Sequence, residues 1–183
     1  MKTTCILASI AVTLSCVGVA SAQMTHDVGV GPGLIFAPAD IVIEVGDTVR
    51  WTWVSGFHNV ESGVNGTYDG NFRSGDPTSV AGTTFEVTFD QAFLDAHPVQ
   101  DDIYNYYCVV HAGLGMVGTV QVVTCPADIS GDHTVDIRDL AALLANYGTS
   151  SGASYFDGDL DFDGDVDLAD LAKLLGLYGT SCF

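Results

Sequence analysis

The stretch from Ile103 to Val122 constrains the fold of this 183-residue chain more than any other. Cys108, His111 and Met116 stand there in a C-x2-H-x4-M array, on one short segment between two strand-like runs. The spacing predicts a tight loop that brings a thiol, an imidazole and a thioether together. His58, in the segment FHNV far upstream, is the candidate for a fourth member of the set.

These four side chains have a recognisable metal chemistry. A thiolate, two imidazoles and a weakly bound thioether form the ligand set of a mononuclear blue-copper site. The sulfur ligands suit Cu(I) and the imidazoles suit both oxidation states, so such a site serves one-electron transfer. A lone Cys, Met or His is usually an ordinary packing or surface residue, and it is the combined spacing that indicates copper.

The sequence around this array is typical of a β-sandwich. Short runs of β-branched and aromatic residues alternate with turn residues, which predicts an antiparallel β-sandwich. The expected strands are residues 41–45, 48–54, 83–89, 104–110 and 118–123. Gly46-Asp47 predicts a tight turn, residues 58–82 are expected to be a loop, and residues 91–97 predict a short helical turn.

The charge excludes several classes of partner. The formal net charge is −18 with only five Lys and Arg residues, whereas nucleic acids and anionic membranes require a basic surface. After the first 22 residues, no apolar run approaches the roughly 20 residues of a membrane helix. An acidic surface suits cationic partners or calcium, or simply solubility.

Residues 1–22 are interpreted as a signal peptide. Lys2 is a minimal basic region, residues 5–19 are apolar, and Ala20-Ser21-Ala22 is a small-residue cleavage site. A lipoprotein signal ending at Cys16 is the alternative. We therefore expect an exported protein in the periplasm, at the cell surface or outside the cell.

Cleavage would leave three cysteines, Cys108, Cys125 and Cys182. An odd number in an oxidising compartment requires one special thiol. Cys108 has metal-ligand neighbours, whereas Cys125 and Cys182 bracket the C-terminal segment. The expected division is one copper thiolate and one disulfide.

Residues 23–124 are expected to form the first domain, and about residues 28 to 123 of it resemble the plastocyanin and pseudoazurin branch of the cupredoxins. The matching residues are Gly46-Asp47-Thr48-Val49, Trp51, His58-Asn59-Val60, Tyr106-Tyr107-Cys108, His111 and Gly115-Met116-Val117-Gly118. The resemblance implies a Greek-key β-sandwich with one type 1 copper, bound strongly by His58, Cys108 and His111 and weakly by Met116. It also implies that Asn59 ties the two ligand segments together.

The same resemblance implies redox partner proteins and two routes for the electron. One is the exposed edge of His111, inside an apolar patch to which Ala112, Leu114 and Met116 would contribute. The other passes Tyr107, for which a packed aromatic residue on the outer sheet face is an equal alternative.

An enzyme is not expected. His26, His97 and His133 form no H-x-H pair of the kind that multicopper oxidases need, and His26 and His97 are expected to be solvated. The predicted function is electron transfer. The alternatives are copper storage or delivery without electron transfer, and a mainly adhesive surface protein.

Residues 125–183 contain an internal repeat with an offset of 31 residues. Each copy places Asp at loop positions 1, 5, 9 and 12, which is calcium-loop spacing. Amphipathic helices follow, with apolar stripes at Leu140, Leu143, Leu144 and Tyr147 and at Leu171, Leu174, Leu175 and Tyr178, and Gly148 and Gly179 are expected to end them.

Within this segment, residues 127–181 resemble a type I dockerin, a small all-α module with two calcium loop-helix motifs. The resemblance implies one calcium at Asp159, Asp161, Asp163, Asp165, Asp167 and Asp170. A second, weaker site would use Asp128, Ser130, Asp132, Asp136 and Asp139, with His133 in place of the loop glycine. Such a module would tether the copper domain to a cohesin-like or other surface scaffold protein.

Overall fold

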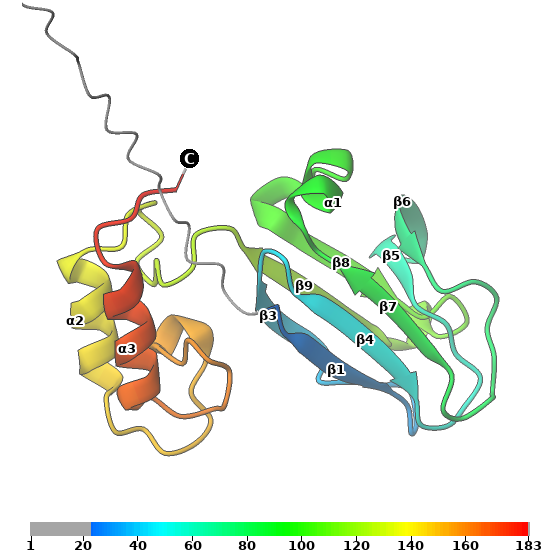
Figure 1. The fold of residues 1–183 in the computed structure, drawn as a ribbon. Helices are drawn as coiled ribbons and strands as arrows, with labels where there is room; N and C mark the ends of the chain where they lie inside the picture. The colour runs from blue at the N-terminus through cyan, green and yellow to red at the C-terminus, as the bar shows by residue number, and fades with distance from the viewer. Residues whose placement is uncertain (1–22, 183) are drawn as a thin grey trace, which may run out of the picture.

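The computed structural model describes residues 23–182 and places a β-sandwich beside a smaller helical module (Figure 1). The expected signal peptide, residues 1–22, lies outside the described residues. Within residues 23–182, no helix has both the length and the apolar character needed to cross a membrane.

Two sheets form the sandwich. The first has the strand order β2-β1-β4-β7, with β1 Thr25–Val30, β2 Phe36–Ala37, β4 Thr48–Trp53 and β7 Thr84–Thr88. The second has the order β3-β9-β8-β5-β6, with β3 Asp40–Glu44, β5 Glu61–Val64, β6 Thr67–Arg73, β8 Ile103–Tyr107 and β9 Val117–Val123. The predicted β-sandwich is thus present in both of its layers.

The strand pattern predicted an antiparallel sandwich, but two of the strand pairs are parallel. β1 pairs in parallel with β4, and β3 pairs in parallel with β9. The turn at Gly46 and Asp47 carries the chain from β3 in one sheet to β4 in the other, so these two consecutive strands do not pair with each other. Gly46 has a left-handed φ of 102°, and the Asp47 carboxylate accepts hydrogen bonds from the Met24 and Glu44 amides.

Residues 58–82 were expected to be a loop, and here the prediction was wrong. They contain the antiparallel hairpin β5–β6, which turns at Asn65 and Gly66, with φ values of 52° and 73°. Two left-handed residues in an Asn-Gly pair match the twist of a β-hairpin. The short helix predicted for residues 91–97 is present as α1, Gln91–Ala96.

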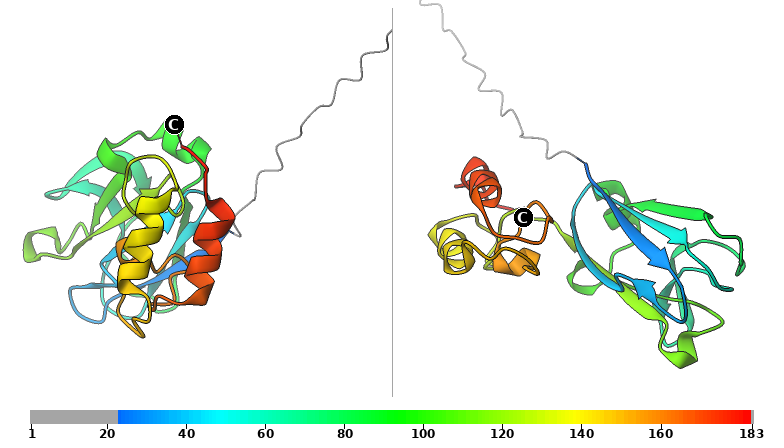
Figure 2. Two further views of the ribbon diagram at one scale, coloured as in Figure 1. Left: turned by 90° about the vertical axis from the view of Figure 1, so that its left-hand side faces the viewer. Right: turned by 90° about the horizontal axis from the view of Figure 1, so that it is seen from below.

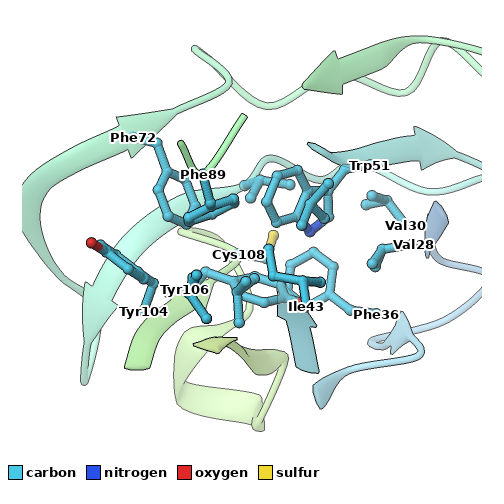
Figure 3. Packing of buried hydrophobic residues seen from close by; sticks show 14 of the residues in the cluster. Val28, Val30, Phe36, Ile43, Trp51, Phe72, Phe89, Tyr104, Tyr106 and Cys108 are labelled. Atoms are coloured by element: carbon cyan, nitrogen blue, oxygen red, sulfur yellow. The ribbon is translucent and has the colours of Figure 1, made fainter. Parts of the chain in front are cut away.

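Aromatic residues fill the space between the sheets, and the Cys108 side chain points into this core (Figure 3). Trp51 is fully buried and lies edge-on to Tyr106, with ring centroids 5.4 Å apart. Phe89 and Tyr104 pack in the same manner at 5.2 Å. Such contacts hold the end of β8 in a rigid surrounding.

The C-terminal module contains two helices, α2 Ile137–Asn146 and α3 Leu168–Leu177, which pack on each other. Asp136 and Asp167 cap their N-termini, and the glycines Gly148 and Gly179, both with positive φ, follow their C-termini. The remaining short helical turns within residues 23–182 are η1 Gln100–Asp102, η2 Ala112–Leu114 and η3 Tyr155–Asp157.

Cys125 and Cys182 form a disulfide across 57 residues, with an S–S distance of 1.97 Å, and Cys108 is a free, buried thiol. The disulfide therefore closes the C-terminal module on itself. A loop of that length contributes about 3 to 4 kcal/mol in the chain-entropy description.

The module rests against the edge of the second sheet (Figure 2). Val42 and Val123 of the sandwich pack against the core of the module. The Lys173 ammonium lies 3.0 Å from the Glu44 carboxylate, and Lys173 is 22% exposed whereas Glu44 is 3% exposed. The two parts thus share apolar contacts and a largely buried ion pair.

His26 takes part in the same contact, contrary to the expectation that it is solvated. Its Nε2 lies 2.8 Å from an Asp47 oxygen, and its ring meets Phe162 of the module edge-on at 5.1 Å.

Candidate metal centre

The loop between β8 and β9 carries three of the four predicted copper ligands. The Cys108 amide donates to the Met116 carbonyl at 3.1 Å, and the His111 amide donates to the Cys108 carbonyl at 3.0 Å. Gly115, with a φ of 84°, ends the single turn η2 and directs the chain back to Met116. Backbone hydrogen bonds thus close the loop and fix the three side chains relative to one another.

His58 reaches the loop from the segment after β4. Its backbone forms a two-way bridge with Thr78, and the indole of Trp53 donates to its carbonyl at 3.0 Å. The ring packs closely against Gly56, where an added Cβ would lie 2.2 Å from the ring nitrogen Nε2. The position of His58 therefore depends on a glycine at residue 56.

Three ligand atoms converge. His58 Nδ1 and His111 Nδ1 are 3.1 Å apart, and Cys108 Sγ lies 3.7 Å from the first and 3.5 Å from the second. Metal–nitrogen and metal–sulfur bonds of about 2.0 and 2.3 Å at trigonal angles give about 3.5 Å between two nitrogens and about 3.7 Å between a nitrogen and the sulfur. The residues present therefore fit a metal ion between them.

Met116 is fully buried in the same core cluster as Cys108. Its amide and carbonyl bond to His111 and Cys108, so all four predicted ligands gather at one place. Because it is buried, Met116 does not contribute to the exposed apolar patch that was expected around His111. That part of the expectation was wrong.

Asn59 links the two ligand segments, as the resemblance implied. Its side-chain oxygen accepts from the Val109 amide at 2.8 Å, and its amide nitrogen donates to the Gly75 carbonyl at 3.2 Å. Asn59 is completely buried. These bonds hold the segment with His58 against the segment with Cys108.

The site favours a neutral imidazole at His58. Burial lowers the pKa of His58, and the neighbouring His111 lowers it further. A neutral imidazole is the form that binds a metal ion.

The surface near the metal centre contains exposed apolar side chains. Leu114, in the turn after His111, is 68% exposed, and Phe57, next to His58, is 54% exposed. His111 itself is half-buried, and Ala112 is partly exposed. The contribution of Phe57 was missed, although its place beside a candidate ligand was visible in the sequence.

Tyr107 is enclosed within the protein. It is 1% exposed, and its hydroxyl donates to Glu61 at 2.8 Å, while Arg73 pairs with the other oxygen of Glu61. Burial, followed by the hydrogen bond to Glu61, raises the pKa of Tyr107 to about 12. The phenol is therefore absent from the surface, whereas Arg73 is 45% exposed.

The predicted calcium-binding segment contains two loops, residues 128–139 and residues 159–170, and their carboxylates are arranged differently. In the second loop, carboxylate oxygens of Asp159, Asp161 and Asp170 lie within 4.8 Å of one another, and so do those of Asp165, Asp167 and Asp170. Asp163, the remaining predicted ligand of this loop, belongs to neither group.

Burial raises the pKa values of three carboxyls in the second loop. For Asp161 and Asp165, neighbouring carboxylates raise the pKa further, and for Asp159 the carboxylate of Asp170 does so. Two oxygens, Asp161 Oδ1 and Asp165 Oδ1, are buried without a hydrogen-bond partner. Negative charge is therefore concentrated in this loop.

In both loops, backbone amides bind the buried carboxylates at loop positions 1 and 12, including Asp159 and Asp170 of the second loop. Asp128 accepts hydrogen bonds from the amides of residues 131, 132 and 133, and Asp139 accepts from those of Ser130 and Asp136. Ser130 is exposed, and Asp132 contacts Arg138. Within the described residues 23–182, the predicted first-loop ligands form no carboxylate group of metal-binding spacing.

Comparison with known proteins relates the sandwich to copper proteins. The chain is 37% identical to a halocyanin of Natronomonas pharaonis over 92 residues, which is 49% of each chain. It is 35% identical to a chloroplastic plastocyanin of Tetradesmus obliquus over 94 residues, 49% of this chain and 59% of that one. The chain thus spans about half the length of the first of these relatives.

Among solved structures, a purple cupredoxin from Nitrosopumilus maritimus is 30% identical, with a TM-score of 0.42, over 53% of this chain and 98% of that one. The sequence model of the copper binding proteins of the plastocyanin/azurin family matches residues 22–123. That range covers more than half of the 183 residues and includes every residue of the candidate metal centre, so the chain belongs to the plastocyanin/azurin family of copper binding proteins.

Proposed function

We propose that this protein is a one-electron carrier with a single type 1 copper site. His58 and His111 would bind through Nδ1, Cys108 through its thiolate, and Met116 as the weak axial ligand. The observation that carries the proposal is the separation of the three strong ligand atoms, 3.1 to 3.7 Å. A copper ion held there supplies a couple between Cu(I) and Cu(II).

The surrounding residues account for the remaining requirements of electron transfer. The aromatic core and Asn59 hold the ligand segments in place, which limits rearrangement when the charge changes. Exposed Leu114 and Phe57 give a redox partner an apolar surface next to the half-buried ring of His111. His111 is therefore our choice for the electron route, with Tyr107 as an enclosed second path.

Copper reconstitution tests this proposal. The mature protein loaded with Cu(II) should have an intense absorption band at about 600 nm, from the bond between thiolate and copper. Cys108→Ser should abolish the band, whereas Met116→Leu should keep it and raise the reduction potential. A colourless copper complex would refute the type 1 site. Copper binding without a reversible one-electron wave would favour storage or delivery.

We further propose that residues 1–22 direct export and that the mature chain contains two domains, residues 23–124 and 125–183. The disulfide between Cys125 and Cys182 supports export, because disulfides persist in oxidising compartments. Mass spectrometry of the protein recovered outside the cytoplasm should find Gln23 at its N-terminus. A chain that retains residues 1–22 would contradict cleavage.

For residues 125–183 we propose a dockerin-like, calcium-dependent anchoring domain. The carboxylate groups around Asp170 and the buried, unpartnered oxygens of Asp161 and Asp165 support a cation in the second loop. Hard cations such as calcium prefer these oxygen ligands. Ile137 and Leu168, at equivalent positions of the two repeats, are 61% and 67% exposed and available to a cohesin-like or other scaffold protein.

Calcium titration and pull-down test the anchoring domain. Calorimetric titration of the mature protein, stripped of metal, should detect calcium binding that Asp170→Asn removes. Immobilised protein should retain a surface protein in calcium and release it in chelator. Absence of calcium binding would refute the dockerin-like assignment, and retention that is insensitive to chelator would refute calcium-dependent anchoring.

A further inference from the structure

The two acidic loops have similar backbone conformations but differ in charge. In both, the N-cap aspartate has nearly the same φ, −134°, and accepts a hydrogen bond from the residue at loop position 11. Of the positions that differ, three change the formal charge when histidine is neutral. The pairs at positions 3, 7 and 11 are Ser130 and Asp161, Thr134 and Asp165, and Arg138 and Ala169. The first loop thus has two fewer carboxylates and one additional cation.

Arg138, the cation of the first loop, contacts one of the expected calcium ligands of that loop. Arg138 Nη1 contacts Oδ2 of Asp132, the residue at loop position 5. The other oxygen of Asp132 accepts from the hydroxyl and the amide of Thr134, at 2.6 and 3.1 Å. The bond from Thr134 and then the one from Arg138 lower the pKa of Asp132. Both oxygens of this carboxylate are therefore engaged.

The second loop has no such counter-charge at the equivalent position. Ala169 stands where Arg138 stands in the first loop, and position 5 is the exposed Asp163. Lys173, the nearest cation on α3, donates to the Leu160 carbonyl and pairs with Glu44, not with a carboxylate of the loop. The buried oxygens of Asp161 and Asp165 keep no partner.

We propose that Arg138, an exposed side chain in contact with Asp132, supplies a positive charge to the first loop and thereby confines calcium binding to the second. This rests on the proposed calcium function of the module. Calcium entering the first loop has to displace the guanidinium from Asp132 and then sit close to a positive charge, with fewer carboxylates to offset both costs. The mature protein therefore binds one calcium ion per chain.

Exchange of the residue at loop position 11 tests this directly. Calcium chloride is titrated calorimetrically into the metal-free, full mature protein. The wild type should bind one equivalent, and Arg138→Gln should gain a second, with at least tenfold higher affinity than any second event in the wild type. Arg138→Lys should restore a single equivalent. In the reciprocal variant, Ala169→Arg, the affinity of the second loop should fall at least tenfold.

Two further variants separate this proposal from the calcium function itself. Asp163→Asn should weaken the single wild-type event at least tenfold, and Asp132→Asn should leave it unchanged. Far-ultraviolet circular dichroism should show that each variant keeps α2 and α3. Two calcium ions bound by the wild type, or one bound by Arg138→Gln, would overturn the role of Arg138. No binding by the wild type would instead overturn the proposed calcium function.

Discussion

Substitution of Lys173 by Met should weaken the contact between the two parts of the protein. The Lys173 ammonium lies 3.0 Å from the Glu44 carboxylate, donates to the Leu160 carbonyl at 2.8 Å, and lies 5.7 Å from the centre of the Phe162 ring. Methionine keeps most of the apolar stem and removes the charge. Lys173→Met therefore isolates the electrostatic part of the contact.

The expected loss follows from the burial of the pair. Removing one partner of a fully buried ion pair costs about 3 to 5 kcal/mol, because the other charge stays in a poorly solvated place. Glu44 is 3% exposed, but Lys173 is 22% exposed, so water can partly replace the ammonium. We therefore expect a decrease of about 2 to 3 kcal/mol in the free energy of unfolding.

The matched control removes an exposed pair from the same sandwich. Arg50 and Asp27 form an ion pair in which the side chains are 39% and 60% exposed. Exposed pairs contribute roughly 0 to 1 kcal/mol. Arg50→Met should therefore change the stability much less than Lys173→Met does.

Urea unfolding of the copper-loaded protein measures both effects. The visible band reports the sandwich, and helical circular dichroism reports the C-terminal module. In the wild type the two transitions should coincide, because the parts share a core contact. In Lys173→Met the helical transition should shift to lower urea and separate from the visible one. Equal stability losses in Lys173→Met and Arg50→Met would refute the assigned role of this ion pair.

Three other predictions concern the sandwich. Gly56→Ala should abolish the visible band, because the new Cβ would lie 2.2 Å from the His58 ring, whereas Gly70→Ala, at a similar φ of 96° but with open space, should retain it; a retained band in both would contradict the close packing. Asn59→Ala should weaken copper binding by about 10- to 100-fold in competition with a chelator, and an unchanged affinity would exclude its supporting role. Burial raises the pKa of Asp47, but hydrogen bonds from an imidazole and two backbone amides lower it more, so the net shift is downward. The stability from this carboxylate is thus present above its unfolded pKa of about 3.9 and lost as the pH falls through the folded value. Asp47→Asn should lower the free energy of unfolding by about 1 to 2 kcal/mol at neutral pH. It should also reduce the further decrease in that free energy below about pH 4. The same pH dependence in the variant and the wild type would contradict this.

The ligand loop could be predicted because its information is local. Cys108, His111 and Met116 lie within nine residues, and the backbone bonds that fix them connect members of the same loop. His58 was found by its chemistry and by the resemblance to a family. The burial of Met116 was not predicted, because it depends on side chains from distant strands that pack over the loop.

The hairpin β5–β6 was missed for a different reason. Asn65-Gly66 is a strong hairpin signal, but the flanking strands lack alternating apolar residues, since β6 is exposed over most of its length. Only Phe72 near its end reaches the core. A polar strand at the edge of a sheet therefore resembles a loop in sequence.

The contact between the two parts has no local signal at all. Glu44 ends a strand near the N-terminus, and Lys173 lies on the last helix. Nothing in either segment identifies its partner, because the pairing depends on how β3 and β9 present the edge of the sheet to the module. The parallel pairing of β1 with β4 and of β3 with β9 depends likewise on the whole topology.

Strand β9 connects the copper-ligand loop with the C-terminal module. It starts at Val117, directly after Met116, and ends at Val123, which packs against the core of the C-terminal module. Seven residues in extended conformation span about 23 Å. The module and the ligand loop accordingly lie at opposite ends of the sandwich (Figure 2). A scaffold protein bound through the module would therefore leave the surface around His111 open to a redox partner, so anchoring and electron transfer can proceed at the same time.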